Sequence, residues 1–320
     1  MMKSQETINN NSGKSKLSNH KKGLLIISFT AFLWSTSGLF IRLLSTGQFQ
    51  IAFYRSLIAT ITVTLIVLFR EKKVTIEKDA ISILCWISYA GLMISFIVAN
   101  RLTKSANVIF LQFTAPVYLL FLEPVFLKKK FKVADLVTIV ITLAGMSLFF
   151  SGKLEPGDMK GNLIAIFAGI CFAFFSLFLK WKKSVHGSEN TIGNIIMGNL
   201  LVAVVCFPIV FNNLSLSLTD TLILAYMGIV QIGISYYIFN EGIKYVSATE
   251  SMIFATLEAV FNPIWVFAGI GEVPSPGAII GGAVIIFAIL FHSFYLSPKF
   301  DNATNQKTAD IPDRQKQLPL

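Results

Sequence analysis

Charged residues are scarce in this sequence. Of its 320 residues, 14% are charged and 54% are hydrophobic, whereas a soluble domain carries nearer a quarter of charged residues. The charge that is present lies in short segments between apolar runs of about twenty residues. A helix of that length spans roughly 30 Å, which is the thickness of the hydrocarbon core of a bilayer. The sequence therefore predicts an integral membrane protein.

The sequence also has few of the residues from which enzymes and cofactor sites are built. Its cysteines, Cys85, Cys171 and Cys206, lie in apolar runs without CxxC spacing, as buried core residues do. None of the three histidines stands at metal-ligand spacing from a carboxylate. The GKS of residues 13–15 is no nucleotide-binding loop, because Ile8 occupies the position of its first glycine. We expect no metal, no cofactor and no enzymatic activity.

The net charge of +10 does not indicate nucleic-acid binding. Basic residues fall at the ends of the apolar runs and in two polar tails, residues 1–21 and 297–320, rather than along one helix face. We therefore expect the partners to be the lipid bilayer and a small-molecule substrate, with no nucleic acid.

Ten segments are long and apolar enough to be transmembrane helices. They are too long and too uniformly apolar for barrel strands, which alternate over about ten residues. The expected fold is an all-α integral membrane protein with helices at residues 22–44, 50–70, 79–100, 105–127, 132–151, 161–182, 190–211, 219–241, 247–270 and 275–296.

Lysine and arginine are distributed asymmetrically about these ten segments. With the N-terminus in the cytoplasm, 21 of the 27 Lys and Arg residues lie on the cytoplasmic side and 4 lie outside. Basic residues favour the cytoplasmic side of membrane proteins. We therefore expect a multi-pass protein of the cell membrane, inner or plasma, with both termini in the cytoplasm.

The two halves of the sequence resemble each other. Residues 22–42 align without gaps on residues 160–180, with seven of 21 positions identical. Equivalent loops differ in charge, because the basic KKKFK after the fourth segment corresponds to GEVPS after the ninth. Each half holds five segments, an odd number, which places the second half upside down in the membrane. Inverted repeats are typical of secondary transporters with a binding site near the midplane.

Four stretches resemble one known family. They are similar to the first, fourth, ninth and tenth spans of EamA-type members of the drug/metabolite transporter superfamily, and they read AFLWSTSGLFIRLL (31–44), ANRLTKSANVIFLQFTAPVY (99–118), YVSATESMIFATLEAVFNPIWVF (245–267) and GEVPSPGAIIGGAVI (271–285). One departure is Glu258-Ala259, where the family often has Glu-Pro. The resemblance implies transport, and two inverted five-helix EamA-like repeats at residues 22–151 and 161–296. It implies no particular substrate.

The ninth apolar run contains a carboxylate, an amide and a proline, in LEAVFNP (257–263). An ionised carboxylate is costly in hydrocarbon, so Glu258 is expected to face the bundle interior or a water-filled cavity. Asn262 lies one turn later on the same face, and Pro263 deprives the Ala259 carbonyl of its helical partner, which predicts a kink. Glu258 and Asn262 are candidate substrate-binding residues, and Glu258 is the proton-coupling candidate. The alternative is a structural glutamate that bonds across helices.

Gln112 and Trp34 are candidates for the same cavity. Gln112 lies in the fourth segment, where Pro116 predicts a second kink at matching depth. Trp34 lies near mid-depth of the first segment, away from the interfacial belt where tryptophan usually occurs. The structural alternatives are a helix–helix hydrogen bond for Gln112 and core packing for Trp34.

Arg55 is a candidate for binding a carboxylate or phosphate group. It lies about five residues into the second segment, roughly 7 Å below the outer surface. The alternative is an ion pair with an acid of an outer loop, Glu155 or Asp158. Glu123, near the end of the fourth segment, is expected to pair with Lys128 or Lys130 rather than to contact substrate.

The eighth segment presents polar residues on two faces. Gln231 and Ser235 share one face, and Tyr236 and Asn240 share another. Periodicity alone leaves open which pair faces inward, and Tyr236 is included among the candidate binding residues. In the tenth segment, the GxxxG of residues 277–281 predicts close helix packing, either within the chain or across a homodimer.

The predicted function is secondary-active transmembrane transport by alternating access around a midplane cavity. The predicted substrates are small metabolites such as amino acids or related compounds, which are exported with proton or counter-substrate coupling. A lipid scramblase or a membrane scaffold is the alternative, and an intramembrane transferase is less favoured because the apolar segments hold no paired catalytic carboxylates.

Overall fold

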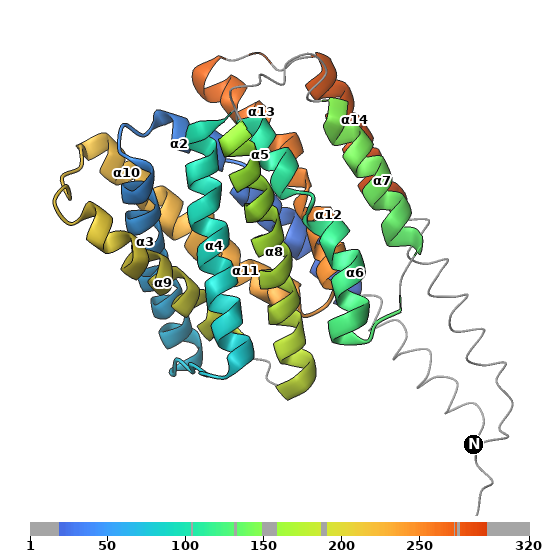
Figure 1. Cartoon of the computed structure of the whole chain (residues 1–320), viewed down its shortest axis with the longest axis horizontal. Coiled ribbons are helices and arrows are strands. Elements are labelled where there is room, and N and C mark those ends of the chain that lie inside the picture. The colour runs from blue at the N-terminus through green and yellow to red at the C-terminus, as the bar shows by residue number, and fades with distance from the viewer. Residues whose placement is uncertain are drawn as a thin grey trace, which may run out of the picture.

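The computed structural model describes residues 19–103, 105–130, 133–148, 159–186, 191–271, 273 and 276–292. Throughout these residues the chain is helical and contains no strand (Figure 1). Eight helical stretches are long and apolar enough to cross a membrane, and two shorter apolar helices cover Val133–Leu148 and Ile279–Phe291. An all-helical membrane fold is therefore confirmed, whereas the count of ten spans stays a prediction.

The helices follow one another with short connections. The first span consists of a helix over residues 19–34 followed by α2. The later elements are α2 (Ser37–Leu43), α3 (Gln48–Glu71), α4 (Ala80–Leu102), α5 (Ser105–Gln112), α6 (Ala115–Leu127), α7 (Val133–Leu148), α8 (Met159–His186), α9 (Ile192–Val210), α10 (Leu218–Tyr226), the π-helix η2 (Met227–Ile234), α11 (Ser235–Gly242), α12 (Ala248–Ala255), α13 (Leu257–Ile270) and α14 (Pro276–Phe291).

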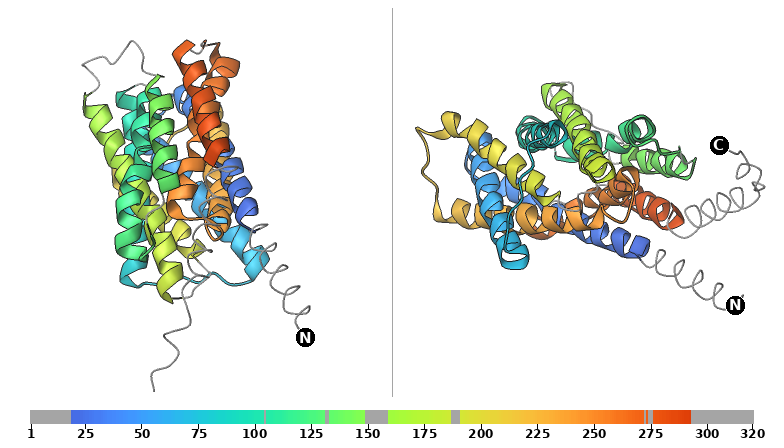
Figure 2. Two further views of the ribbon diagram at one scale, coloured as in Figure 1. Left: turned by 90° about the vertical axis from the view of Figure 1, so that its right-hand side faces the viewer. Right: turned by 90° about the horizontal axis from the view of Figure 1, so that it is seen from below.

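The bundle is built around α4, which packs against both α8 and α9. On one side α3 packs against α9 and η2, and on the other side α5 and α6 pack against α8. Helices α7 and α14 pair with each other at one edge of the bundle (Figures 1 and 2). The centre is therefore enclosed by helices from both halves of the chain.

The surface and the interior have the polarity expected of a protein in lipid. Large apolar side chains point outward from many helices, for example Phe69, Phe121 and Val125. Polar side chains lie inside instead, including Arg55 and Glu258. An apolar surface together with charged side chains in the interior suits a hydrocarbon surround.

The contact between α7 and α14 depends on Gly145 of α7. A Cβ atom added to Gly145 of α7 would lie 3.0 Å from the carbonyl oxygen of Gly281 and 3.1 Å from a side-chain carbon of Val284. The close approach predicted from the GxxxG of α14 thus occurs within the chain at Gly281. A homodimer stays a prediction.

Three spans are interrupted by Ser or Thr residues. The first span breaks at Ser35 and Thr36, the fourth at Thr114 and the ninth at Thr256. At each break a hydroxyl donates to the carbonyl oxygen three residues earlier, over 2.6–3.0 Å. Such local bonds compete with the regular helical pattern, and they explain where these spans break.

Pro116 lies beside the break in the fourth span, as the sequence predicted, whereas Pro263 does not mark the break in the ninth span. Pro116 is in the first turn of α6, just after the break at Thr114. Pro263 lies inside α13 and does not end it, so the ninth span is interrupted seven residues before Pro263. The break of the ninth span lies at Thr256, after α12, and a kink at Pro263 stays a prediction.

Candidate functional site

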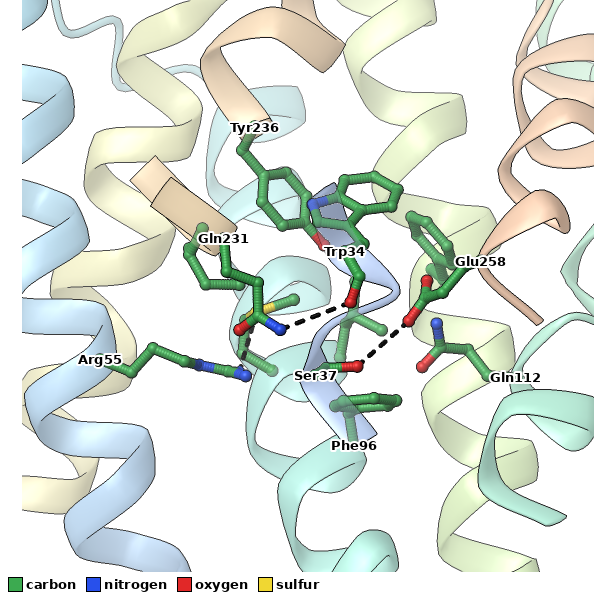
Figure 3. A pocket seen from close by; sticks show the side chains of 12 residues that line it. Trp34, Ser37, Arg55, Phe96, Gln112, Gln231, Tyr236 and Glu258 are labelled. Carbon is green, nitrogen blue, oxygen red and sulfur yellow. Dashed lines mark hydrogen bonds between the residues drawn. The ribbon is translucent and has the colours of Figure 1, made fainter. Parts of the chain in front are cut away.

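A pocket lies at the centre of the bundle, where the interrupted first, fourth and ninth spans meet (Figure 3). The empty space around its side chains, including space open to solvent, is about 350 Å³. Its lining comes from both halves of the chain and consists of Trp34, Ser37, Arg55, Leu92, Met93, Phe96, Gln112, Phe172, Gln231, Ile232, Tyr236 and Glu258.

Glu258 faces this pocket from the first turn of α13. Its side chain is 3% exposed and accepts a hydrogen bond from the Ser37 hydroxyl at 3.4 Å (Figure 3). The break at Thr256 creates a helix N-terminus just before it, and the dipole of that terminus favours a carboxylate. The interruption of the ninth span therefore both places and stabilises this acid.

Arg55 faces the pocket from the opposite side, on α3 (Figure 3). It is 1% exposed, and its Nη2 donates to the sulfur of Met93 at 3.4 Å. Among the described residues its Nε has no hydrogen-bond partner. The predicted alternative partners Glu155 and Asp158 lie outside the described residues, so that alternative stays untested. Arg55 thus presents a buried positive charge to the cavity.

Trp34 forms an aromatic wall of the pocket. Its ring centroid lies 4.7 Å from that of Tyr236, 5.2 Å from that of Phe239 and 5.8 Å from that of Phe172. Its indole Nε1 donates to the hydroxyl of Ser235 at 2.7 Å, which fixes the ring orientation. Trp34 therefore both lines the cavity and packs in the core, so the two predicted roles are not exclusive.

The π-helix η2 decides which residues of the eighth span face the pocket. Gln231 and Tyr236 both line it, whereas Ser235 bonds Trp34 and Asn240 accepts from Thr191. Neither predicted pair faces inward as a whole. In a π-helix the backbone bond spans five residues, so residues five apart, such as Gln231 and Tyr236, come onto one side. Regular α-helical spacing could not reveal this pairing.

Gln112 and Asn262, the two candidate amides, differ in position. Gln112 lies beside Glu258 in the pocket (Figure 3), and its Oε1 has no partner among the described residues. Asn262 does not line the pocket, because its amide donates to the backbone carbonyl of Ser35 at 2.8 Å. It braces the break in the first span. The structure thus brings five of the six predicted binding residues together.

Sequence reasoning missed several residues of the pocket. Ser37, Met93, Phe96 and Phe172 line it, but nothing in their spacing distinguishes them from other residues of apolar helices. Ser37 alone had a signal, since it is one of four consecutive small or polar residues at 35–38. That run also contains the break of the first span.

Glu123 has a structural role outside the pocket. Its carboxylate accepts from the backbone nitrogen of Ala248 at 3.0 Å and from the Thr249 hydroxyl at 2.5 Å, which caps the start of α12. It also lies 3.5 Å from the ammonium of Lys129. Glu123 therefore pairs with a lysine of the basic cluster, as predicted, but that lysine is Lys129 and neither Lys128 nor Lys130.

A second group of titratable residues lies apart from the pocket. Asp135, Glu250 and His292 are buried, and one potential ligand atom of each lies within 4.8 Å of the others. No sequence pattern indicated such a group, because its three members come from helices far apart in the chain. The absence of metal-ligand spacing along the sequence therefore did not exclude a group that forms in three dimensions.

A model of the EamA-like transporter family matches residues 21–151 and 159–294. The chain belongs to this family. EamA-like transporters form part of the drug/metabolite transporter superfamily, so the resemblance seen in the sequence is confirmed. Together with its apolar helices, the match makes the chain a multi-pass membrane transporter rather than an enzyme.

Curated relatives of this EamA-like protein carry general names. YwfM of Bacillus subtilis (strain 168), an uncharacterized transporter, is 26% identical over 297 residues, which is 89% of this chain and 96% of YwfM. An uncharacterized transporter of Clostridium kluyveri is 25% identical over 293 residues, which is 84% of this chain and 91% of the relative. YdfC of Bacillus subtilis (strain 168) is 23% identical over 246 residues, which is 76% of this chain and 80% of YdfC.

A solved structure has the same fold. It is described only as "Crystal structure of protein" and matches with a TM-score of 0.72 at 16% identity. The match covers 86% of this chain and 98% of the other. At this identity it supports the fold of the EamA-like chain and nothing about its substrate.

Proposed function

We propose that this EamA-like protein is a secondary-active exporter of small metabolites such as amino acids or related compounds. The central pocket binds the substrate, and alternating access exposes it to each side of the membrane in turn. Three interrupted spans meet at the pocket, and interrupted helices around a central site are the usual construction of such transporters.

The observation that carries the proposal is the pair of opposite charges across the pocket. The Arg55 guanidinium lies on one side and the Glu258 carboxyl on the other, with Trp34 and Tyr236 beside them (Figure 3). A guanidinium binds a carboxylate, a carboxylate binds an ammonium group, and aromatic rings accept an apolar side chain. A zwitterionic metabolite with a small apolar part fits all three.

Unpartnered polar atoms in the lining support a binding role. The Nε of Arg55 and the Oε1 atoms of Gln112 and Gln231 lack hydrogen-bond partners among the described residues. Buried polar groups in folded proteins are nearly always bonded, so these three atoms are expected to bond substrate or water in the pocket.

Proton coupling by Glu258 follows from its place in the site. The carboxyl is buried, bonds Ser37 and lies across the cavity from Arg55. An ionised acid at mid-membrane is costly without a partner. Binding of a cationic substrate group and binding of a proton therefore compete for the same carboxylate, as an exchange mechanism requires.

The proposed arrangement in the membrane has ten spans. Residues 22–151 and 161–296 form two inverted five-helix repeats, and residues 1–21 and 297–320 are cytoplasmic tails. The excess of Lys and Arg on one side supports both cytoplasmic termini in the cell membrane. The weak internal repeat supports the inversion.

The proposal is tested with purified full-length protein. A panel of metabolites is screened by thermal shift in detergent, because a ligand that binds the folded state raises Tm. Ligands that bind are then followed as flux in proteoliposomes with an imposed pH gradient. We expect zwitterionic metabolites to raise Tm and to be transported. Movement of labelled lipid without flux of any soluble metabolite would support a scramblase instead.

The variant Glu258→Gln tests the coupling. It keeps the shape of the side chain and its bond with Ser37 but cannot exchange a proton. We expect substrate flux to lose its dependence on the pH gradient and to fall at least tenfold, about 1.4 kcal/mol. Glu241→Gln is the control, because Glu241 pairs with Lys244 away from the pocket. Unchanged pH-dependent flux in Glu258→Gln would remove Glu258 from the mechanism.

A further inference from the structure

The buried group formed by Asp135, Glu250 and His292 joins three elements at one end of the bundle. Asp135 lies in the first turn of α7, Glu250 in the first turn of α12, and His292 directly follows α14. All three residues are at most 5% exposed. None of them lines the central pocket, so the group requires its own explanation.

The hydrogen bonds of Thr138 determine which nitrogen of His292 carries a proton. The Thr138 hydroxyl has one hydrogen, and it donates this hydrogen to the carbonyl oxygen of Ala134 at 2.8 Å. The same oxygen lies 2.8 Å from Nδ1 of His292, and we infer that it accepts from Nδ1, because this arrangement uses both contacts of the hydroxyl. The neutral imidazole consequently carries its proton on Nδ1 and has a bare lone pair on Nε2.

This lone pair points at two carboxylates. Nε2 of His292 lies 3.7 Å from an oxygen of Asp135 and 3.8 Å from an oxygen of Glu250. Nε2 has no hydrogen-bond partner among the described residues. The lone pair and the two carboxylate oxygens are all electron-rich, and a cation or a proton placed between them would offset their repulsion.

Glu250 is held in place for such a role. One carboxylate oxygen accepts from the backbone nitrogen of Ser247 at 3.1 Å, as part of the cap of α12. The other oxygen is directed to His292 and also lies 3.3 Å from Nε2 of His20. The His20 side chain is 25% exposed, and it places a second imidazole beside Glu250.

We propose that Asp135, Glu250 and His292 bind a divalent transition-metal ion of the zinc class. One imidazole nitrogen and two carboxylate oxygens are a donor set typical of zinc, manganese or iron, whereas magnesium and calcium favour oxygen alone. A tetrahedral ion with bonds near 2.1 Å places ligand atoms roughly 3.4 Å apart. The observed 3.7 and 3.8 Å contacts need only a small closure.

The ion would connect the ninth span to α7 and α14. Glu250 precedes Glu258 by eight residues, about 12 Å along a helix, and the break at Thr256 lies between them. The metal site therefore fixes the α12 half of the interrupted span and leaves the α13 half, which carries the pocket carboxyl, outside its direct contacts.

The first test uses full-length protein in detergent after treatment with a chelator. We expect it to bind about one Co²⁺ per chain, with visible d–d absorption and no thiolate charge-transfer band, since no ligand is a cysteine. Zinc at a hundredfold excess over its Kd is expected to raise Tm by about 5 °C. Magnesium and calcium at the same concentration are expected to leave Tm unchanged.

Variants assign the ion to these residues. His292→Gln and Asp135→Asn are expected to weaken Co²⁺ binding at least a hundredfold. Thr138→Val, which removes the acceptor of the Nδ1 proton, is expected to weaken it 10- to 100-fold. Glu241→Gln is the matched control and is expected to bind as the native chain does.

Three results would overturn the metal site. They are a native chain without stoichiometric Co²⁺ binding, a thiolate band in its spectrum, or native affinity in folded His292→Gln and Asp135→Asn. The titration of the native chain is sufficient alone if a variant does not fold. If no metal binds and NMR spectra show a protonated His292, a proton rather than a metal ion lies between His292 and the two carboxylates. None of these results depends on whether the central pocket transports a metabolite.

Discussion

At the scale of single residues, the central pocket combines groups that lipid-exposed helices cannot tolerate. Arg55 and Glu258 are both buried, yet neither forms an ion pair within the described part of the chain. A buried charge without a partner reduces stability. The protein therefore keeps these charges at a cost, which is expected where the substrate completes their interactions.

The variant Arg55→Met separates binding from stability. It has a similar length and removes a buried charge whose only described bond is to Met93. We expect the KM for a carboxylate-bearing substrate to rise at least tenfold while Tm in detergent stays the same or increases. Transport assays and thermal unfolding of the same preparation measure both. A drop in Tm of several degrees would show that Arg55 serves the fold.

At the scale of helices, a polar cluster fastens the connection between α3 and α4 to α8. Asp79 caps α4 by accepting from the backbone nitrogens of Ile81 and Ser82 at 3.1 and 3.2 Å, and it also pairs with Lys182 of α8. Lys182 lies 2.6 Å from Glu77 as well. Partial burial opposes ionisation, but the bonds from Lys182 and Ser82 hold the pKa of Asp79 below its ordinary value.

The variant Asp79→Asn tests this cluster through pH. Asparagine retains the cap and removes the charge, so we expect the free energy of unfolding at pH 7 to fall by about 1–2 kcal/mol. Because folding lowers the pKa of Asp79, its contribution is complete above about pH 4 and is lost at lower pH. Unfolding is measured from pH 7 to 3. The difference in unfolding free energy between the native chain and Asp79→Asn is expected to become smaller as the pH falls.

If the difference in unfolding free energy between the native chain and Asp79→Asn stays constant with pH, the role given to the Asp79 charge is contradicted. Glu77→Gln serves as the comparison, because Glu77 contacts the same lysine without capping a helix. Its side chain is more exposed, and a smaller effect is expected.

The pairing of α7 with α14 gives a second prediction at the element scale. In Gly145→Val the added side chain would meet the Gly281 carbonyl oxygen and Val284 at 3.0–3.1 Å, so the helices must separate. We expect a loss of about 1–3 kcal/mol in unfolding free energy. Gly282→Ala is the control, because its nearest contact lies at 3.5 Å. If the two variants have the same free energy of unfolding, the contact between α7 and α14 at Gly145 is not closely packed.

At the scale of the whole molecule, the orientation proposed for the chain rests on the distribution of its charge. Single cysteines at Ser4 and Ser297 probe the two tails, and one at Ser215 probes an exposed loop on the opposite side, after α9. We expect a membrane-impermeant thiol reagent added to intact cells to label only the cysteine at 215. Labelling of either tail from outside would reverse the proposed orientation or remove the inverted repeat.

Much of the pocket could be predicted because charged and amide side chains are rare in apolar helices. Glu258, Arg55 and Gln112 stand out as polar residues in lipid-length segments, and Trp34 stands out by its depth. Asn262 lies one helical turn from Glu258 but does not line the pocket. The break in the first span leaves the Ser35 carbonyl oxygen available, and the Asn262 amide donates to it. Helical spacing is an unreliable guide where helices are interrupted.

The sequence by itself determined the membrane environment, the helical fold and the family, because these depend on the length of apolar runs and on local patterns. Only the tertiary structure decided the facing of Gln231 and Tyr236, which a π-helix controls, and the meeting of Asp135, Glu250 and His292. Both depend on how distant or irregular segments pack. Packing brings together residues that are far apart in the chain and follow no periodic pattern. Their contacts therefore cannot be predicted from a local sequence pattern.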